Sequence, residues 1–229
     1  MTEQQESIFK LNRKQWFDGQ LKNLGFKKYK TNCLVRLTKD DILQILNFQK
    51  EARGVPEFSI NICIRPLFWK NESLTLKPGF RLAENDKTDQ WFSYKDEETA
   101  RENFSSAYTL ILEKAIAFFD NTLTPKSIVK VFEMNEYKKP IWGYSPWMEY
   151  ELGLLYIKTG DLQKAFYYLE IAANGFLNSA NKYLHTYGDA CENIIKLLGN
   201  QEKIQRLILS MTNESITNLR LENLVSHRW

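Results

Sequence analysis

Residues 58–65 read Phe-Ser-Ile-Asn-Ile-Cys-Ile-Arg, and this stretch decides the fold of the first half of the chain. Apolar and polar side chains alternate strictly, so the four apolar side chains face one side of an extended segment. This two-residue period is typical of an antiparallel strand with one buried face. Pro66 follows directly and predicts the end of the strand, because proline lacks the N–H that a sheet ladder requires.

Short apolar runs on either side of this strand predict a small sheet. Residues 33–37 and 42–48 are two further predicted strands, joined by the hairpin-like connection Thr38-Lys39-Asp40-Asp41. A fourth strand is expected near residues 74–82, where Pro78-Gly79 interrupts it. The sequence therefore predicts an antiparallel sheet of three to four strands.

Two long helices are expected to flank these strands. Apolar side chains recur at helical spacing in residues 7–24, and Gly25 stands where a left-handed C-terminal residue is expected. Asp96-Glu97-Glu98 opens the second helix, because carboxylates are favoured at the positive end of the helix dipole. We therefore expect an α+β domain over residues 1–121, in which two long helices accompany the sheet.

Five motifs carry a resemblance to a known family. They are LGFKKYKTNCLVRL (24–37), ILQILNFQK (42–50), FSINICI (58–64), FRLAEND (80–86) and DQWFSY (89–94). In this order they resemble a bacterial domain of unknown function, the family numbered 4304, over residues 7–120. The resemblance implies no activity, cofactor or catalytic residue, because the family has none established. Its members often end where this chain continues for about another hundred residues.

The second half of the chain predicts only helices. Residues 122–146 contain three prolines and read as a connector with one short helix near 126–134. Residues 147–229 follow as an all-α region. Its beginning resembles one tetratricopeptide repeat, with the motif residues Leu152, Gly153 and Tyr156 in a first helix, Gly160 and Asp161 in a turn, and Ala165, Leu169 and Ala172 in a second helix.

A single helical hairpin of this kind does not form a stable fold by itself. Small residues such as Gly153 and Ala165 allow the two helices to approach closely. No second copy of the motif follows after one period of about 34 residues, and about three repeats are normally needed for stability. We therefore expect the hairpin to pack on helices over residues 175–198 and 201–224.

Composition restricts the class of protein without naming a function. The 229 residues carry 31 Lys and Arg against 28 Asp and Glu, a net charge of +3, so the whole chain is not a polycation. The first seven residues are polar and acidic, unlike a secretory signal, and no run approaches the ~20 apolar residues of a membrane span. Three cysteines without CxxC spacing argue against a disulfide framework. These features predict a cytoplasmic protein with reduced, mostly buried thiols.

Motifs for catalysis or cofactor binding are not found in the sequence. It contains no GxGxxG, no GxxxxGK[ST] and no GxSxG, which are the usual phosphate-binding and nucleophile signatures. His185 and His227 lie outside any cluster with metal-ligand spacing. Asp40 and Asp41 are interpreted as solvated turn residues. We therefore expect no metal, no cofactor and no enzymatic activity.

A basic segment is the one charge feature above background. Residues 10–39 contain nine Lys or Arg and one acid, interleaved with aromatic side chains. Basic and aromatic side chains together can bind phosphates and stack bases, and the candidate nucleic-acid-binding residues are Lys14, Lys27, Lys28, Tyr29 and Lys30. A solvated helix face and a charged edge strand explain the same pattern, and we favour this structural interpretation.

An aromatic connector is the other candidate site. Residues 142–147 read Trp-Gly-Tyr-Ser-Pro-Trp, and the candidate protein-binding residues are Trp142, Tyr144, Trp147 and Tyr150. The same aromatic side chains could instead hold the two halves of the chain together, which we regard as the more common use of such residues.

The leading expectation is a non-catalytic bacterial protein that binds another protein, because tetratricopeptide-like hairpins commonly serve protein recognition. An immunity or antitoxin-like role would suit a protein of this size, by analogy alone. Nucleic-acid binding through residues 10–39 is one alternative. An enzyme with an unrecognised site near Trp142, where the two halves join, is another.

Overall fold

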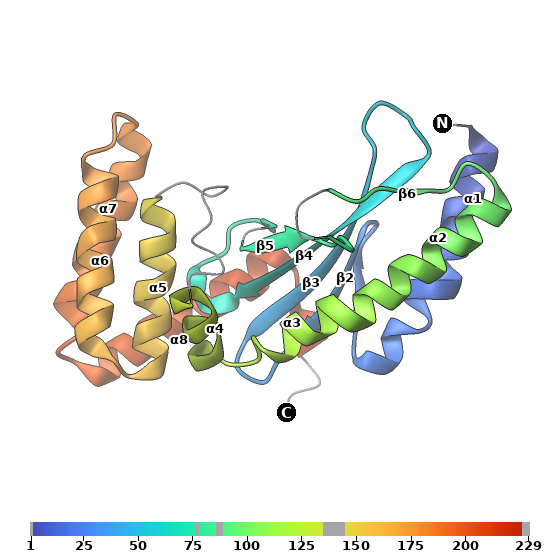
Figure 1. Ribbon diagram of the computed structural model, residues 1–229. Helices are drawn as coiled ribbons and strands as arrows, with labels where there is room; N and C mark the ends of the chain where they lie inside the picture. Colours follow the sequence, from blue (N-terminus) through green and yellow to red (C-terminus); the bar gives the residue numbers. More distant parts are fainter. Residues whose placement is uncertain (1, 77, 86–88, 135–144, 226–229) are drawn as a thin grey trace. The chain divides into compact units, whose positions relative to one another are not determined.

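The computed structural model describes residues 2–76, 78–85, 89–134 and 145–225 (Figure 1). The chain divides into two compact units. The first comprises residues 1–65 and 75–120, and the second comprises residues 66–74 and 121–229. The short segment 66–74 lies between two strands of the first unit in sequence, yet it belongs to the helical second unit.

The first unit contains an antiparallel sheet with more strands than the sequence predicts. The central strands are β2 (Cys33–Leu37), β3 (Ile42–Lys50) and β4 (Glu57–Pro66), as expected, and β5 (Gly79–Arg81) falls within the predicted fourth strand. The order is β1-β2-β3-β4-β5, with β6 (Phe92–Ser93) also paired to β4. The expectation of three to four strands is therefore wrong, because β1 (Lys27–Lys30) and β6 extend the sheet to six strands.

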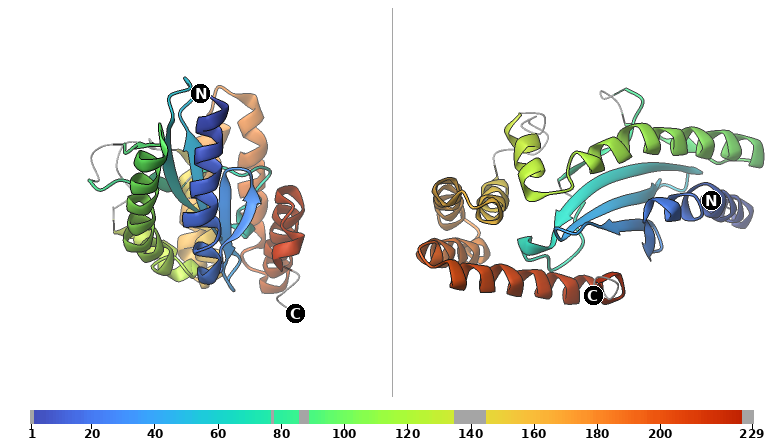
Figure 2. Two further views of the ribbon diagram at one scale, coloured as in Figure 1. Left: turned by 90° about the vertical axis from the view of Figure 1, so that its right-hand side faces the viewer. Right: turned by 90° about the horizontal axis from the view of Figure 1, so that it is seen from below.

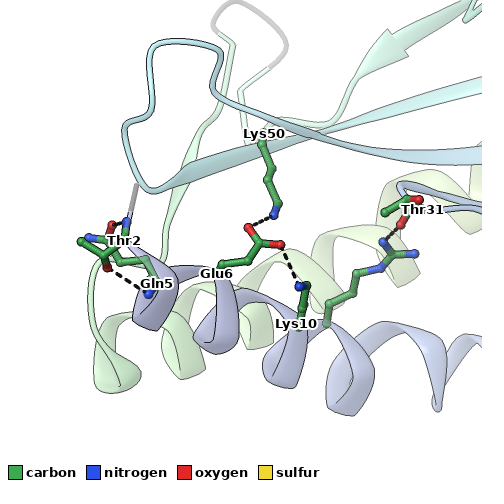
Figure 3. Close-up of polar contacts among 7 residues, drawn as sticks. Thr2, Gln5, Glu6, Lys10, Thr31 and Lys50 are labelled. Carbon is green, nitrogen blue, oxygen red and sulfur yellow. Dashed lines mark hydrogen bonds and ion pairs between the residues drawn. The ribbon is translucent and has the colours of Figure 1, made fainter.

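The N-terminal helix begins earlier than residue 7. Helix α1 (Glu3–Arg13) starts at Thr2, whose side chain accepts from the Gln5 N–H while the Gln5 side chain accepts from the Thr2 N–H, a capping box (Figure 3). Gly25 ends the helical stretch in the left-handed conformation, at φ +85°, as its sequence position predicts. Asp96 caps α2 (Glu97–Leu110) by accepting from the Thr99 N–H.

Helices α1 and α2 lie against the same face of the sheet (Figure 2). The interface is filled by stacked and tilted rings: Phe17 and Phe48 have centroids 4.7 Å apart, and Phe58 and Phe104 have centroids 4.5 Å apart. All four rings are buried. Phe58, Ile60, Ile62 and Ile64 of β4 are buried, as the two-residue period predicts. The expectation of a single buried face is wrong, because Ser59, Cys63 and Arg65 on the other face are buried as well. After α2, the chain continues as a π-helical segment, Ile111–Ile116, and then as α3 (Ala117–Asp120).

The second unit is built from helices. They are α4 (Pro125–Glu133), α5 (Pro146–Thr159), α6 (Leu162–Leu177), α7 (His185–Leu197), α8 (Gln201–Leu219) and the short α9 (Glu222–Val225). The predicted short helix and the predicted α5–α6 hairpin are confirmed. The prediction of one helix over 175–198 is wrong: α6 ends at Leu177, and Asn181 caps a new turn at Lys182–Leu184 that leads into α7.

Gly153 sets the distance between α5 and α6. A Cβ at this position would lie 2.6 Å from Cγ of Leu169, closer than side-chain carbons approach one another. Leu169 and Ala165 of α6 are fully buried. The predicted role of Gly153 in close helix contact is therefore confirmed.

Residues 66–74 pack on α8 within the second unit. The Asn71 N–H donates to Oγ of Ser215 at 2.6 Å, and the Asn218 side chain donates to the Asn71 carbonyl at 3.3 Å. Lys158 of α5 lies over the ring of Phe68, 5.5 Å from its centroid. A loop between two strands of the first unit thus supplies buried contacts for the second. In the described part of the chain, no helix combines the length and the apolar character that a membrane span requires.

Candidate functional site

The start of α5 holds the aromatic residue that the sequence singled out. Ser145 caps the helix by accepting from the Trp147 N–H at 3.4 Å, and Pro146 occupies the first helical position, where its missing N–H is not needed. These two residues fix Trp147 in the first turn. Its side chain is 38% exposed, which is unusual for the most hydrophobic aromatic residue in a folded protein.

Trp147 belongs to a cluster of rings from α5, α6 and α7. Its ring centroid lies 4.9 Å from that of Phe176 on α6 and 4.4 Å from that of Tyr187 on α7, both in edge-on geometry. Tyr183 contacts Tyr187 in turn, with centroids 5.8 Å apart. We refer to these residues together with Tyr150 as the aromatic cluster, which therefore comprises Trp147, Tyr150, Phe176, Tyr183 and Tyr187.

The aromatic cluster has a buried base and an exposed rim. Phe176 is fully buried and Tyr150 is 5% exposed, so these two rings anchor the cluster between the helices. Trp147 and Tyr183 form the rim, and Tyr183 is 60% exposed. Rigid aromatic side chains that project from a buried base are typical of residues that dominate binding energy at protein interfaces.

Two hydroxyl groups of the aromatic cluster, those of Tyr150 and Tyr187, have raised pKa values. Burial is the main cause that raises the pKa of Tyr150, and the nearby Glu151 and Glu214 carboxylates raise it further. The pKa of Tyr187 is raised first by its hydrogen bond with Tyr183, whose hydroxyl lies 3.3 Å away, then by burial and by Glu72. Both hydroxyls are therefore hydrogen-bonding groups rather than nucleophiles or bases.

The structure brings together two of the four predicted protein-binding residues. Trp147 and Tyr150 are both members of the aromatic cluster, whereas Trp142 and Tyr144 lie outside the described residues. Sequence reasoning missed Phe176, Tyr183 and Tyr187. Tyr183 and Tyr187 are four residues apart in a helical stretch, and this spacing is the signal that could have identified them.

The predicted nucleic-acid-binding residues lie on two elements of the first unit, strand β1 and the segment that follows α1. Lys27, Lys28 and Lys30 are exposed on β1, which is an edge strand, and Tyr29 between them is half-buried. Lys14 is exposed in the turn that follows α1. Lysines along an edge strand also prevent unwanted pairing with other chains, as the structural interpretation states.

Two arginines of the basic segment make hydrogen bonds and ion pairs within the first unit. Arg13 is 6% exposed, pairs with Asp18 at 3.3 Å and donates to the Thr31 carbonyl. Arg36 donates to the Gln44 side chain at 2.6 Å and to the Leu24 carbonyl at 3.2 Å. The local excess of positive charge at the surface is therefore carried by the lysines.

A second group of polar residues joins α4, α5 and α6. Lys164 donates to Glu133 at 2.8 Å, and the Tyr156 hydroxyl also donates to Glu133. The hydrogen bond with Glu133 is the main cause that raises the pKa of Lys164, and burial is the main cause that raises the pKa of Tyr156. Lys164 is therefore a cation and Tyr156 a neutral donor at physiological pH, an arrangement that stabilises the hairpin and supplies no general base.

Across the described ranges, no set of three or more His, Cys, Asp and Glu side chains lies close enough together to hold a metal ion. Cys33, Cys63 and Cys191 are free and buried, as predicted, and burial raises the pKa of Cys191 to about 12. Such a thiol is a poor nucleophile at neutral pH. Asp41 adopts φ +61° in the connection between β2 and β3, which agrees with its interpretation as a turn residue.

Comparisons with known proteins add no family to this description. The chain matches no protein-family model, no curated protein and no solved structure.

Proposed function

We propose that the protein is a non-catalytic binding module that recognises another protein through the aromatic cluster. The observation that carries this proposal is the exposed rim of Trp147 and Tyr183 above the buried Phe176 and Tyr150. Trp and Tyr are the residue types most enriched among interface hot spots, and their two-torsion side chains lose little conformational entropy on binding.

The local architecture supports the same proposal. Hairpin α5–α6 keeps the residues of the tetratricopeptide-like motif in its interior, since Leu152, Gly153, Tyr156, Ala165, Leu169 and Ala172 are all buried. Each repeat of that class presents helix surfaces to a partner. An immunity or antitoxin-like role, in a bacterial protein whose residues 7–120 resemble domain family 4304, is the specific form of this proposal and rests on analogy.

The test is an affinity purification of the tagged full-length chain from its native host, with and without nuclease treatment. Proteins recovered with the native chain are compared with those recovered with Tyr183→Ala and Trp147→Ala. A partner that survives nuclease and is lost with both variants supports the proposal. A set of proteins that is unchanged in both variants contradicts it.

Two controls separate binding from folding. Tyr183 is 60% exposed and contacts Tyr187 within the cluster, so its removal is expected to lower the thermal unfolding temperature only slightly. Trp147→Ala is expected to lower it more, because it removes contacts with the buried Phe176 as well as with Tyr187. Tyr167→Ala serves as the matched control, because Tyr167 of α6 is 57% exposed and lies outside the aromatic cluster. Recovery of the partner should depend on Tyr183 and not on Tyr167.

Nucleic-acid binding through the basic segment is the second candidate. Its supporting observation is the exposure of Lys27, Lys28 and Lys30 on a single edge strand. Each phosphate contact made by a lysine adds to the dependence of the binding constant on salt concentration. Binding of single-stranded RNA that weakens steeply with salt and is lost when all three lysines become Glu would favour this candidate.

The third candidate, an enzyme with a site near Trp142, concerns residues outside the described ranges.

A further inference from the structure

The two rim rings of the aromatic cluster, Trp147 and Tyr183, each meet the ring of Tyr187 at a steep angle. The planes of Trp147 and Tyr187 are 66° apart with centroids at 4.4 Å, and those of Tyr183 and Tyr187 are 71° apart with centroids at 5.8 Å. Trp147 and Tyr183 keep 38% and 60% of their surfaces exposed. A ligand from solvent can therefore contact more than one ring at once.

Two other aromatic rings of the second unit lie under a lysine of the chain itself. Lys164 lies 5.0 Å from the ring centroid of Tyr156, and Lys158 lies 5.5 Å from that of Phe68. Over the ranges that the structure describes, no Lys or Arg is placed over Trp147, Tyr183 or Tyr187 in this way. Lys182, although next to Tyr183 in sequence, is exposed. Within the described ranges, the faces of Trp147, Tyr183 and Tyr187 are therefore not covered by a cation.

Carboxylates surround the aromatic cluster. Glu72, from the segment between β4 and β5, acts on the Tyr187 hydroxyl both by charge and by a hydrogen bond. Glu151 follows Trp147 by one turn on α5, and both Glu151 and Glu214 act on Tyr150. Glu214 is partly neutralised by Lys70 at 3.6 Å. Glu72 therefore provides negative charge beside the ring of Tyr187, and aromatic rings themselves favour cations.

We propose that the partner segment bound by the aromatic cluster carries a Lys or Arg side chain whose cationic head lies against Trp147, Tyr183 and Tyr187, with Glu72 as its counter-charge. This inference rests on the proposed function and specifies the chemistry of the partner at the same site. Arg and Lys prefer Trp and Tyr faces in such contacts, and nearby carboxylates add selectivity for basic over acidic segments.

The experiment uses the full chain labelled with ¹⁵N and follows the indole N–H resonance of Trp147 by NMR. This resonance is assigned by its disappearance in Trp147→Phe. Two synthetic dodecapeptides are titrated separately, one alternating Arg with Ala and the other alternating Glu with Ala. The indole resonance reports on the aromatic cluster itself, so binding of the acidic peptide to the lysines of β1 is not mistaken for binding at this site.

A saturable shift of the Trp147 resonance with the basic peptide, and none with the acidic peptide, is the expected result. Glu72→Gln should weaken the binding about twofold to fivefold, the effect of one exposed charge, and Glu72→Lys should weaken it about tenfold. Tyr183→Ala should weaken it by a similar factor through the lost ring contact. Glu113→Gln makes the same change at an exposed glutamate of the first unit and should leave the affinity unchanged.

A Trp147 resonance that does not move with the basic peptide, or moves equally with the acidic one, would overturn the inference. Unchanged affinity in Glu72→Lys would also overturn it. The affinity purification distinguishes this failure from failure of the proposed function. If the cellular partner is lost with Tyr183→Ala but retained with Glu72→Lys, protein binding stands and the cationic contact is wrong. If neither variant changes recovery, both proposals fail.

Discussion

The backbone N–H of Asn71 donates to the side-chain oxygen of Ser215 at 2.6 Å, although 144 residues separate the two in sequence. Both residues are buried, with 2% of Asn71 and none of Ser215 exposed. This hydrogen bond holds residues 66–74, which lie between β4 and β5 in sequence, against helix α8 of the second unit. The helical unit is therefore completed by a segment that the chain supplies much earlier.

Replacement of Ser215 by Ala should destabilise the second unit. The variant removes a buried acceptor from the Asn71 N–H, and such losses cost about 1–3 kcal/mol of the free energy of unfolding. Ser210→Ala on the same helix removes only an exposed contact with Glu214 and should change stability by less than about 0.5 kcal/mol. Urea denaturation followed by circular dichroism measures both. Equal stability of the two variants would contradict a structural role for the contact.

Replacement of Gly153 by Ala should separate α5 from α6. The added Cβ would lie 2.6 Å from Leu169 Cγ, so the helices must shift, at a cost of about 1–3 kcal/mol. Gly199→Ala is the matched control, because no atom lies within 4 Å of a Cβ there. Thermal unfolding should show a lower midpoint for Gly153→Ala and an unchanged or slightly higher one for Gly199→Ala. A Gly153→Ala protein as stable as the native chain would contradict close helix packing at this residue.

Arg13 should affect stability rather than binding. Its guanidinium pairs with Asp18, donates to the Thr31 carbonyl and lies over the Phe48 ring, 5.1 Å from the centroid. Arg13→Met should therefore cost about 2 kcal/mol or more, whereas the neighbouring exposed Lys14→Met should cost less than about 0.5 kcal/mol. Chemical denaturation of the two variants checks this difference. If the two variants are equally stable, the contacts of Arg13 contribute no more to stability than those of an exposed lysine, and the prediction is wrong.

Glu6 should contribute stability that depends on pH. The hydrogen bond from Lys50 is the main cause that lowers the pKa of Glu6 below its usual value of 4.5, and Lys10 adds to the effect (Figure 3). A lowered folded-state pKa stabilises the protein above the unfolded-state pKa, and this stabilisation is lost as pH falls through the folded-state value.

Glu6→Gln should therefore be less stable than the native chain at pH 7, by about 0.5 kcal/mol, and equally stable near pH 3. Denaturation curves at several pH values provide the measurement. A difference that persists unchanged at pH 3 would show that the carboxylate charge is not its cause.

Strands with a clear alternation could be predicted from the sequence, and weakly patterned strands could not. Residues 58–65 mark β4 because one face is apolar throughout. Strand β1 reads Lys-Lys-Tyr-Lys and buries almost nothing, since it lies at the edge of the sheet. It pairs with β2 through backbone hydrogen bonds, and these do not depend on an alternation of apolar and polar side chains.

The break between α6 and α7 shows a second limit of sequence patterns. Residues 178–182 read Asn-Ser-Ala-Asn-Lys and interrupt the apolar pattern, whereas the periodicity of the residues on either side predicts one helix over 175–198. The capping chemistry of Asn181, whose side chain accepts from the Tyr183 N–H, outweighs that periodicity and starts a new turn.

The aromatic cluster shows why only part of the candidate site could be predicted. Trp147 and Tyr150 lie close together in sequence and were recognisable as a pair. Phe176 and Tyr187 meet Trp147 only because α6 and α7 return to the start of α5, which is a tertiary contact. Glu72 lies further away still in sequence, in the segment between β4 and β5.

The most direct test of protein binding at the aromatic cluster is site-specific photo-crosslinking in the native host. A photoreactive phenylalanine analogue replaces Tyr183 in one strain and Leu209 of α8, which is also 60% exposed, in another. The account predicts one discrete crosslinked protein at position 183 and none of the same identity at position 209. No crosslinked protein at position 183, or the same products at both positions, would contradict the account.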